Sequence, residues 1–333
     1  MASSDNPADS RTLELMVRQI RFEGRSINSY EFVDPSGELL PAFTAGAHID
    51  VHIDEHLNDG FVRQYSLSNP PNERHRYVIA VLRDEAGRGG SKALHDRLHV
   101  QHKVRISHPR NNFELAADAS KVILLAGGIG MTPLKAMAHR LEEVGIDYEM
   151  HYCAKDESCT AFAAELAPMH ASGKLQFHFD NGDPSKGLDL KRLLSETAPG
   201  VHVYYCGPGG FMKACAAATG HWTPGTVHFE HFKAPERAAS DKVAAAVGEF
   251  IVKIASTGQQ IPVSSDRSIA DALEDAGVAI ETSCRAGLCG TCKVRYVSGE
   301  VEHNDCILGD DEKQEYLTTC VSRASSQELV LDL

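Results

Sequence analysis

Hydrophobic and polar residues alternate along the first third of the chain. The alternation at residues 13–17 and again at 49–53 has the two-residue period of a strand with one buried face. Further β-rich runs cover 77–82 and 100–106, and Gly, Pro and Asn turn signals separate them. Many short strands with such turns predict an antiparallel β-barrel domain, for which we expect the bounds 1–116.

A continuous apolar run at residues 122–126 begins a different pattern. Such a run is typical of a parallel strand buried on both faces, and the segment 134–144 that follows has apolar residues at helical spacing. Two more runs, 148–153 and 201–206, indicate further strands. This alternation of strands and helix predicts an α/β domain with a parallel sheet at residues 117–232.

A third segment follows a stretch that is rich in alanine and charge. Residues 233–248 have little periodicity, and we interpret them as a linker. After them, 250–254 has the pattern of a strand. A short helix is then predicted, with Ser268 as its N-cap and Gly277 as its stop. We therefore expect a separate third domain at residues 249–333.

Composition and charge narrow the class of protein. Hydrophobic residues make up 42% and charged residues 24%, which are ordinary values for a globular chain. No apolar run approaches the roughly 18 residues of a membrane span, and the first residues lack a secretory signal, so we expect a cytoplasmic protein. The net charge of −13 argues against broad contact with nucleic acid or an anionic membrane.

Cysteines and acidic residues are both concentrated near the C-terminus. From Glu249 onward there are 15 acidic and 7 basic residues, a balance of −8 in 85 residues. Four cysteines have the spacing C-x4-C-x2-C with a distant fourth: Cys284, Cys289, Cys292 and Cys320. This is the spacing of plant-type [2Fe–2S] ferredoxins, and Gly287 and Gly290 would let backbone N–H groups approach the sulfur atoms. A structural zinc site is the alternative, although only one short C-x2-C pair is present. Cys306 lies outside the pattern.

A glycine turn follows the apolar strand and opens a helix. Gly128 and Gly130 occupy the first two positions of a dinucleotide fingerprint, and Pro133 replaces its third glycine. A helix N-terminus beside such a turn suits a pyrophosphate. Taken alone, the motif is equally consistent with a tight packing turn.

Two further features support a nucleotide site. Cys206-Gly207-Pro208 ends another β run, and the carboxyl ends of strands are where open α/β sheets bind ligands. Asp156 follows the second strand, where an acid can accept the ribose 2′-hydroxyl, and a solvated turn is the alternative. An acid at this position predicts a preference for NADH over NADPH, although Lys155 precedes it.

Two pieces of the barrel segment have the groups that a flavin phosphate needs. Arg63-Gln64-Tyr65-Ser66 supplies a cation, a hydroxyl and an aromatic ring, and Gly89-Gly90-Ser91 supplies backbone donors. Read alone, the two pieces fit a cross-strand pair and a hairpin turn equally well or better.

In this order, the motifs resemble those of the phthalate dioxygenase reductase family from about Leu13 to Leu333. The resemblance implies an FMN-binding β-barrel, a ferredoxin-reductase-type NAD domain and a C-terminal β-grasp plant-type ferredoxin domain. It assigns FMN to Arg63, Gln64, Tyr65, Ser66, Ala80, Val81, Leu82, Gly89, Gly90 and Ser91. It assigns the dinucleotide to Ile129, Gly130, Thr132, Cys206, Gly207 and Pro208, and the motifs above add Gly128, Pro133 and Asp156 to this site.

The resemblance also implies a function. Cys206, Thr132 and Phe232 are expected where nicotinamide meets flavin, with Phe232 shielding the flavin; a core residue is the alternative for Phe232. NADH would reduce FMN, and electrons would pass singly through the [2Fe–2S] cluster to a terminal Rieske-type oxygenase acting on an aromatic acid or a methoxylated aromatic. The alternatives are a cytochrome P450 as acceptor, or a non-catalytic iron–sulfur or zinc sensor. Gly209-Gly210 departs from the family pattern.

Overall fold

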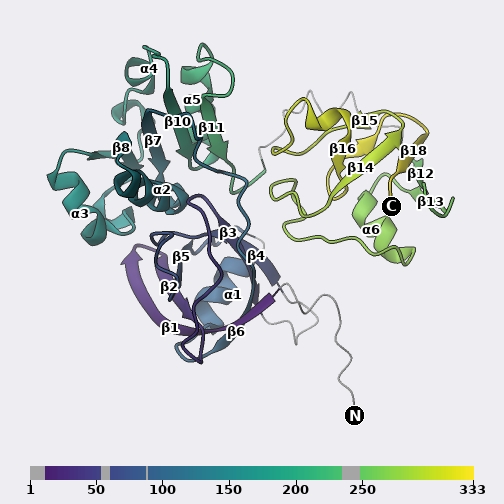
Figure 1. Cartoon of the computed structure of the whole chain (residues 1–333), viewed down its shortest axis with the longest axis horizontal. Coiled ribbons are helices and arrows are strands. Elements are labelled where there is room, and N and C mark those ends of the chain that lie inside the picture. The colour runs from purple at the N-terminus through teal and green to yellow at the C-terminus, as the bar shows by residue number, and fades with distance from the viewer. Residues whose placement is uncertain (1–11, 54–60, 88, 235–247) are drawn as a thin grey trace. The chain divides into compact units, whose positions relative to one another are not determined.

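The computed structural model describes residues 12–53, 61–87, 89–234 and 248–333. The chain divides into two units, Met1–Phe232 and Lys233–Leu333, and each is described by itself (Figure 1). The predicted linker at 233–248 lies mostly outside the described residues. Across the described ranges, no helix is long and apolar enough to cross a membrane.

The first sheet of the larger unit is antiparallel and has the order β4-β3-β6-β1-β2-β5. Contacts between its edge strands β4 and β5 close it into a barrel, and helix α1 (Gly90–Arg97) packs against β3 and β4. The strands are β1 (Thr12–Gly24), β2 (Ile27–Val33), β3 (His48–Ile53), β4 (Phe61–Ser66), β5 (Tyr77–Leu82) and β6 (Lys103–Ser107).

The barrel strands follow the predicted alternation, with one difference. Leu15, Val17, Ile49 and Val51 all lie in one buried core, as their period of two requires. The strand predicted to start at residue 100 begins at Lys103 instead. The chain turns before it, because Gln101 has a left-handed φ of 72° that a strand cannot contain.

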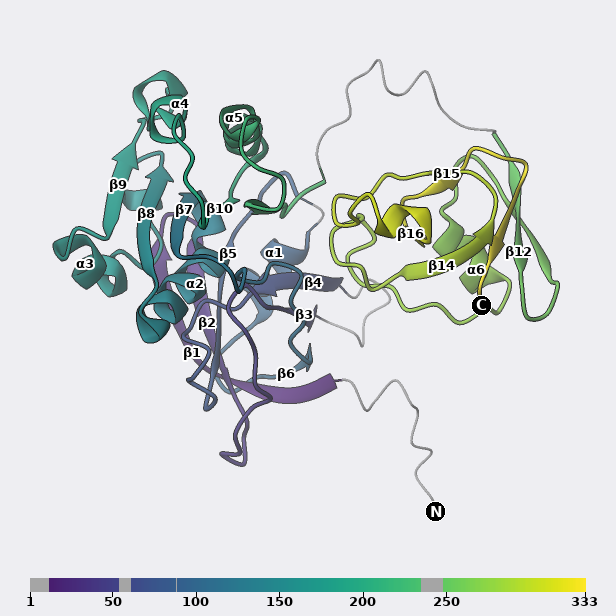
Figure 2. The same cartoon turned by 45° about the horizontal axis from the view of Figure 1, so that its top comes forward.

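The second sheet of this unit is parallel and has the order β11-β10-β7-β8-β9. Its strands are β7 (Lys121–Gly127), β8 (Asp147–Ala154), β9 (Leu175–Phe179), β10 (Val201–Cys206) and β11 (Val227–Glu230). Helices α2 (Met131–Val144) and α3 (Ala163–Ala171) bury apolar residues against one face, and α4 (Leu190–Leu193) and α5 (Gly209–Thr219) against the other (Figure 2). Successive residues of β7 show this, since Leu124 belongs to the first core and Leu125 to the second.

The glycine turn connects β7 to α2 without a loop. Gly128–Gly130 forms a single 3₁₀ turn that continues directly into the helix. Helix α2 therefore starts at Met131, earlier than the predicted Leu134, and Pro133 lies in its first turn, where the missing N–H has no partner to lose. The strand order changes direction between β7 and β10, and this switch point is where open α/β sheets bind ligands.

The barrel and the α/β domain share buried side chains. Ile27, Ala45 and Ala80 of the barrel belong to the apolar core that contains α2 and β7. Lys135 of α2 is buried between the two domains, where its Nζ donates to the carbonyl of Ser68 at 3.1 Å and pairs with Glu165 at 2.8 Å. The chain just after β4 and helix α2 are thus held in a fixed relation.

The described part of the smaller unit contains a mixed sheet with the order β13-β12-β18-β14-β16, together with helix α6. Helix α6 (Ile269–Asp275) begins as predicted, because Ser268 and Asp271 form a capping box, and Gly277 follows its end with a φ of 74°. The strands are β12 (Phe250–Ile254), β13 (Gln260–Val263), β14 (Lys293–Ser298), β16 (Tyr316–Thr318) and β18 (Glu328–Leu331), with β15 (Val301–Glu302) and β17 (Arg323–Ala324) as a separate pair.

Candidate cofactor and electron-transfer sites

The predicted phosphate-binding residues of the flavin site meet at the start of α1. Gly89 precedes the helix with a φ of 85°, which favours glycine. A Cβ atom on Gly90 would lie 2.5 Å from Nε of Arg63, so the missing side chain at residue 90 makes room for the arginine. The structure thereby places a cation from β4 beside the first N–H groups of a helix, an arrangement that suits a phosphate.

The other predicted residues of β4 have distinct environments. Gln64 donates to Asp50 at 3.2 Å, and Tyr65 packs against the barrel core. Burial raises the pKa of the Tyr65 phenol, so this residue offers a neutral hydroxyl and an aromatic face. Ser66 lies at the end of the strand and points toward the α/β domain, where it donates to Glu230 at 3.3 Å.

The predicted flavin residues of β5 do not share one face. Ala80 belongs to the core shared with the α/β domain, whereas Val81 lies in the barrel core. The carbonyl of Val81 is 2.9 Å from the His95 ring. Leu82 is 42% exposed. The side chain of Val81 therefore cannot contact a flavin outside the barrel. Ser91 accepts the N–H of Asp84 at 3.1 Å and keeps its own proton available.

The predicted nucleotide motifs come together at the carboxyl ends of β7 and β10. A Cβ atom on Gly130 would lie 2.1 Å from the carbonyl oxygen of Cys206, so only glycine permits this approach of the two strand ends. Gly127 and Gly207 are similarly close across the gap, because a Cβ on Gly207 would lie 2.9 Å from Cα of Gly127. Thr132 is buried, and its hydroxyl donates to the carbonyl of Ile129 at 3.1 Å. The threonine thus rigidifies the Gly128–Gly130 turn, the predicted dinucleotide site.

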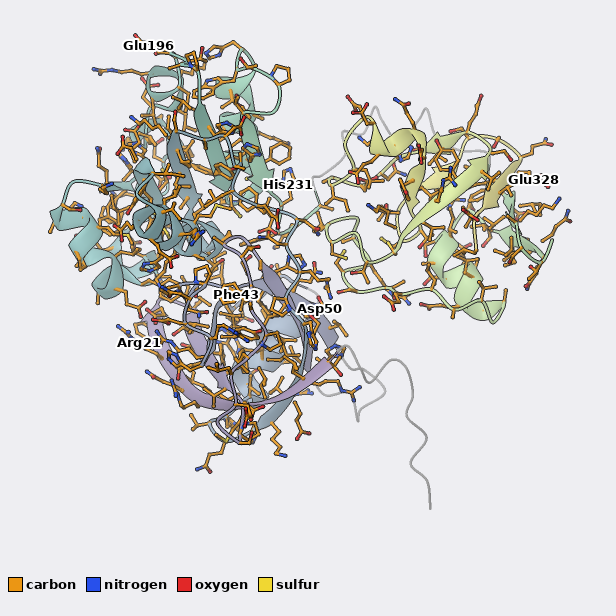
Figure 3. All side chains as sticks on the ribbon, in the orientation of Figure 1. Arg21, Phe43, Asp50, Glu196, His231 and Glu328 are labelled. Carbon is orange, nitrogen blue, oxygen red and sulfur yellow. The ribbon has the colours of Figure 1, made fainter. Side chains whose placement is uncertain are left out.

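Cys206 is fully buried at the end of β10. Burial raises the pKa of its thiol, and the carboxylate of Glu230 adds to the effect. The side chain is therefore a neutral thiol, and its environment does not activate it as a nucleophile. Phe232, the predicted flavin shield, is 38% exposed, which rules out the alternative reading of a core residue. Figure 3 shows its neighbour His231 where the α/β sheet ends.

Glu230 was not among the predicted site residues, although the structure places it between both motifs. It is the last residue of β11 and is paired in register with Cys206. Its two oxygens approach Ser66 and His48, with 3.9 Å between Oε1 and Nδ1 of His48. Burial raises the pKa of this carboxyl group to about 7, although the hydrogen bond from Ser66 partly opposes that effect. An acid that gains and loses a proton near neutral pH thus lies beside the predicted flavin and nicotinamide residues.

Asp156 lies after β8, as expected, but its carboxylate has partners. It accepts the N–H of Ser158 at 3.0 Å and forms an ion pair with Arg25, which comes from the β1–β2 hairpin of the barrel. The predicted hydrogen bond to a ribose hydroxyl stays a prediction, and it would have to be made alongside this ion pair.

The four predicted cluster ligands converge in the smaller unit. Cys284 contacts Cys289 and Cys320, and Cys320 also contacts Cys292. The loop around them has left-handed residues, Arg285, Gly287 and Gly290, with φ of 48°, 70° and 72°. A Cβ on Gly287 would lie 2.7 Å from Val321, so this glycine is required by both conformation and space.

The chemistry of this loop fits an iron–sulfur cluster. The N–H groups of Ala286 and Leu288 both approach Sγ of Cys284 at 3.4 Å. Contacts with Cys289 and Cys320, together with these amides, lower the pKa of the Cys284 thiol, whereas the same contacts raise the pKa of the Cys289 and Cys320 thiols. Within the described residues, no group of three His, Cys, Asp or Glu side chains is arranged to hold a single metal ion. The convergence of four cysteine thiols is compatible with a two-iron cluster, which distributes four thiolates over two metals.

The acidic stretch that follows the third ligand packs against the cluster loop. A Cβ on Gly287 would lie 3.0 Å from Cα of Asp305, and one on Gly290 would lie 3.1 Å from Ile307. Asp305 is a structural residue, because its side chain has 0% exposure and accepts two backbone N–H groups. Glu312 pairs with Lys293 at 3.1 Å. In contrast to the buried Asp305 and the paired Glu312, Asp310 and Asp311 are exposed acids of this stretch.

Comparisons with known proteins agree with this geometry. Residues 252–325 match the 2Fe-2S iron-sulfur cluster binding domain family. The chain is 53% identical over 327 residues to the reductase subunit of a tert-butanol monooxygenase and tert-amyl alcohol desaturase from Aquincola tertiaricarbonis, covering 96% of each protein. It is 43% identical to a vanillate O-demethylase oxidoreductase from Pseudomonas sp., covering 96% of this chain and 100% of that protein.

Two solved structures extend the comparison. A phthalate dioxygenase reductase, described as a modular structure for electron transfer from pyridine nucleotides to [2Fe–2S], is 41% identical, with a TM-score of 0.73 and coverage of 98% and 100%. An intact self-sufficient cytochrome P450 monooxygenase is 34% identical with a TM-score of 0.85. The match covers 97% of this chain but only 41% of that protein.

The barrel, the parallel sheet and the four-cysteine loop together define an NADH-dependent iron–sulfur flavoprotein oxidoreductase, with FMN and a [2Fe–2S] cluster as its cofactors. The predicted fold class of three domain types is confirmed. The chain belongs to the phthalate dioxygenase reductase family.

Proposed function

We propose that this protein is the reductase component of a two-component Rieske-type oxygenase system. The observation that carries the proposal is that one chain combines the flavin and nucleotide modules with a cluster-binding unit whose Asp310 and Asp311 are exposed near the cluster loop. A reductase of this kind needs an external acceptor, because its own last carrier is the cluster. Relatives with full coverage are named as reductases of oxygenases, including a tert-butanol monooxygenase and a vanillate O-demethylase.

When bound, FMN and the [2Fe–2S] cluster would supply the redox chemistry that links NADH, a two-electron donor, to a one-electron acceptor. The chain's own residues position these groups. Arg63 and the start of α1 would hold the flavin phosphate, and the Gly128–Gly130 turn would hold the pyrophosphate. Lys135 fixes α2 to β4, so the nicotinamide and flavin sites keep one relative position.

Three residues surround the predicted point of hydride transfer. Cys206 is a neutral, buried thiol that excludes water, and Phe232 is exposed and free to cover an aromatic ring. Glu230 holds a proton below about pH 7 and accepts a hydrogen bond from Ser66. These groups shape and desolvate the site, and Glu230 can hold or release a proton at its carboxyl oxygen.

The substrate of the oxygenase is a separate question from the class of oxygenase that accepts the electrons. We expected an aromatic acid or a methoxylated aromatic, and the relative at 53% identity instead serves a monooxygenase named for tert-butanol. The reductase never contacts that substrate, so its own residues favour neither chemistry. The proposal therefore concerns the acceptor protein, and the substrate follows from that partner.

Reconstitution tests the proposal. The purified chain should show flavin and cluster absorbance that NADH bleaches, and stopped-flow mixing should reduce a purified Rieske-type oxygenase encoded beside it. A cytochrome P450 serves as the competing acceptor, because the chain matches 41% of a self-sufficient cytochrome P450 monooxygenase. Faster reduction of the P450 would contradict the proposal, and a colourless protein would support the sensor alternative.

A further inference from the structure

A shallow hollow in the smaller unit lies between the end of α6 and the first cluster ligand (Figure 1). It has a volume of about 530 Å³, and its lining residues are Glu274, Gly277, Val278, Ala279, Ile280 and Glu281. Cys284 follows the last of these residues after two intervening positions. The hollow therefore borders the segment that enters the cluster loop.

The way in which α6 ends leaves apolar residues at the surface. Gly277 has a φ of 74°, and its N–H donates to the carbonyl of Glu274 at 3.0 Å. The N–H of Val278 donates to the carbonyl of Leu273 at 2.9 Å, so the helix closes with a Schellman motif. Val278 and Ile280 are then half-buried against the core of the unit, and Ala279 between them is exposed.

Ile280 connects the hollow to the surroundings of the cluster ligands. Its side chain packs against a small buried group that consists of Ala270, Cys292 and Cys320. One residue thus belongs both to the lining of the hollow and to the packing around two of the four ligands. The rate of electron transfer falls steeply with the separation of donor and acceptor, so a redox partner has to bind where the ligands lie close to the surface.

The rim of the hollow is acidic. Its charged lining residues are Glu274 and Glu281, and among the described residues no basic side chain lines it. Residues 267–285 include four acidic and two basic residues, a balance of −2. Arg285 pairs with Asp271 and Glu274, both at 2.6 Å, and is therefore held against α6. This charge is complementary to a partner that carries basic residues around an apolar one.

We infer that this hollow is the docking site of the acceptor oxygenase, which inserts an apolar side chain that lysine or arginine residues surround. The inference rests on the proposed function and adds to it the place where the acceptor binds. Exposed acids elsewhere in the unit, such as Asp310 and Asp311, steer the encounter at long range, whereas the apolar floor of the hollow holds the complex once it has formed. The two contributions can be separated, because salt screens steering and does not weaken the burial of apolar surface.

Ala279→Trp in the full-length protein with both cofactors tests the docking site, because Ala279 is exposed and a bulky side chain there fills the hollow. Calorimetry measures the dissociation constant of the oxidised protein for a purified Rieske-type oxygenase encoded beside it, and stopped-flow mixing measures the rate of oxygenase reduction. The dissociation constant should rise by about tenfold or more, and the second-order rate should fall by a similar factor. Both changes should persist from about 0.1 M to about 1 M salt.

Glu281→Lys tests the acidic rim independently of the apolar floor. Reversing this charge should weaken binding by about tenfold at low salt, since the new cation faces the basic residues of the partner. Glu328→Lys is the matched control, because Glu328 is exposed on β18 of the same unit and undergoes the same change of charge. If both variants weakened binding equally, only net charge would matter, and the inference would fail.

Val297→Trp is the matched control for the added bulk. Val297 is 61% exposed on β14 and does not line the hollow, so this variant should bind the oxygenase as wild type does. Unchanged affinity in Ala279→Trp, or an equal loss of affinity in Val297→Trp, would overturn the inference. Slower reduction of the cluster by NADH in Ala279→Trp, or the loss of self-association that wild type shows, would assign the hollow to the chain itself and overturn it as well. A wild-type protein that neither binds nor reduces a Rieske-type oxygenase would instead refute the proposed function.

Discussion

The hydroxyl of Ser66 donates to Oε2 of Glu230 at 3.3 Å and so joins the last residue of β4 to the last residue of β11. This hydrogen bond connects β4, the predicted flavin strand, to the edge of the parallel sheet, and it gives Glu230 a partner where burial otherwise disfavours its charge. The first prediction follows from that environment.

Glu230→Gln should change how stability depends on pH. Because burial raises the pKa of Glu230 from 4.5 to about 7, the native protein holds a proton between these values that the unfolded chain has released. The free energy of unfolding therefore falls through this group as pH rises from 4.5 to 7. Glutamine stays neutral, so the variant should melt at a higher temperature than wild type at pH 8 and at a similar temperature at pH 5. The rate of flavin reduction by NADH should also lose an inflection near pH 7. Parallel melting curves across this range would contradict the assignment.

Cys320→Ser should remove one cluster ligand and with it the absorbance and electron paramagnetic resonance signal of the reduced cluster. Reduction of ferricyanide by NADH should persist, since the flavin and nucleotide residues belong to the other unit. Cys306→Ser is the matched control in the same segment and should preserve both the cluster signals and the reduction of ferricyanide. If ferricyanide reduction disappeared together with the cluster, the two units would not function independently.

Gly90→Ala should weaken FMN binding without unfolding the barrel. The new Cβ would lie 2.5 Å from Nε of Arg63, and a flexible arginine can move away, but then it leaves the phosphate. Loss of one charge-assisted interaction should raise the dissociation constant of FMN by about tenfold, as flavin fluorescence titration would measure. Gly209→Ala is the control at another helix start, because a Cβ on Gly209 would have no neighbouring atom within 4 Å. It should leave the dissociation constant of FMN unchanged. Equal FMN affinity in both variants would mean that Arg63 does not hold the phosphate.

Neutralising Asp310 and Asp311 should slow electron delivery to the oxygenase. Charge steering dominates encounters with small interfaces, and the Debye length falls from about 10 Å at 0.1 M to roughly 3 Å at 1 M salt. The reduction rate of the oxygenase should therefore fall with ionic strength in wild type and change less in Asp310→Asn/Asp311→Asn. Reduction of the bound flavin by NADH should be far less sensitive to salt.

Glu328→Gln is the control for the loss of an acidic charge. Glu328 is exposed on β18 and is labelled in Figure 3. If Glu328→Gln lowered the reduction rate of the oxygenase as much per charge as the Asp310 and Asp311 substitutions do, the lower rate would come from net charge. A reduction rate that does not change with salt in wild type would mean that Asp310 and Asp311 are ordinary surface residues.

The parts of the site that the sequence predicts are those whose chemistry is local. The cysteine spacing, the Gly128–Gly130 turn and the Ser268 cap each depend on residues a few positions apart, and the structure places each as expected. Such patterns can be recognised in the sequence because residues of one short segment determine most of the local geometry.

The parts that sequence reasoning missed depend on distant pairing. Glu230 was passed over in favour of Phe232, two residues later, because nothing in the sequence reveals that the end of β11 lies in register with Cys206. An acid at the end of a strand was the one available signal. Arg25 and Asp156 are separated by 131 positions, and no local pattern links a hairpin turn to a loop of another domain. The same holds for Val81, whose place in the barrel core follows from strand register.

The shared core of the barrel and the α/β domain has a consequence for how such chains recombine. Ile27, Ala45, Ala80 and Phe113 complete a core whose other buried members come from the α/β domain, and Lys135 is buried at the same boundary. A genetic crossover near residue 116 would separate these groups and leave apolar surface and a buried cation without their partners. A crossover after Phe232 would cut neither core. The ferredoxin unit is therefore the part that can be gained, lost or exchanged by gene fusion, whereas the flavin and nucleotide domains are inherited together.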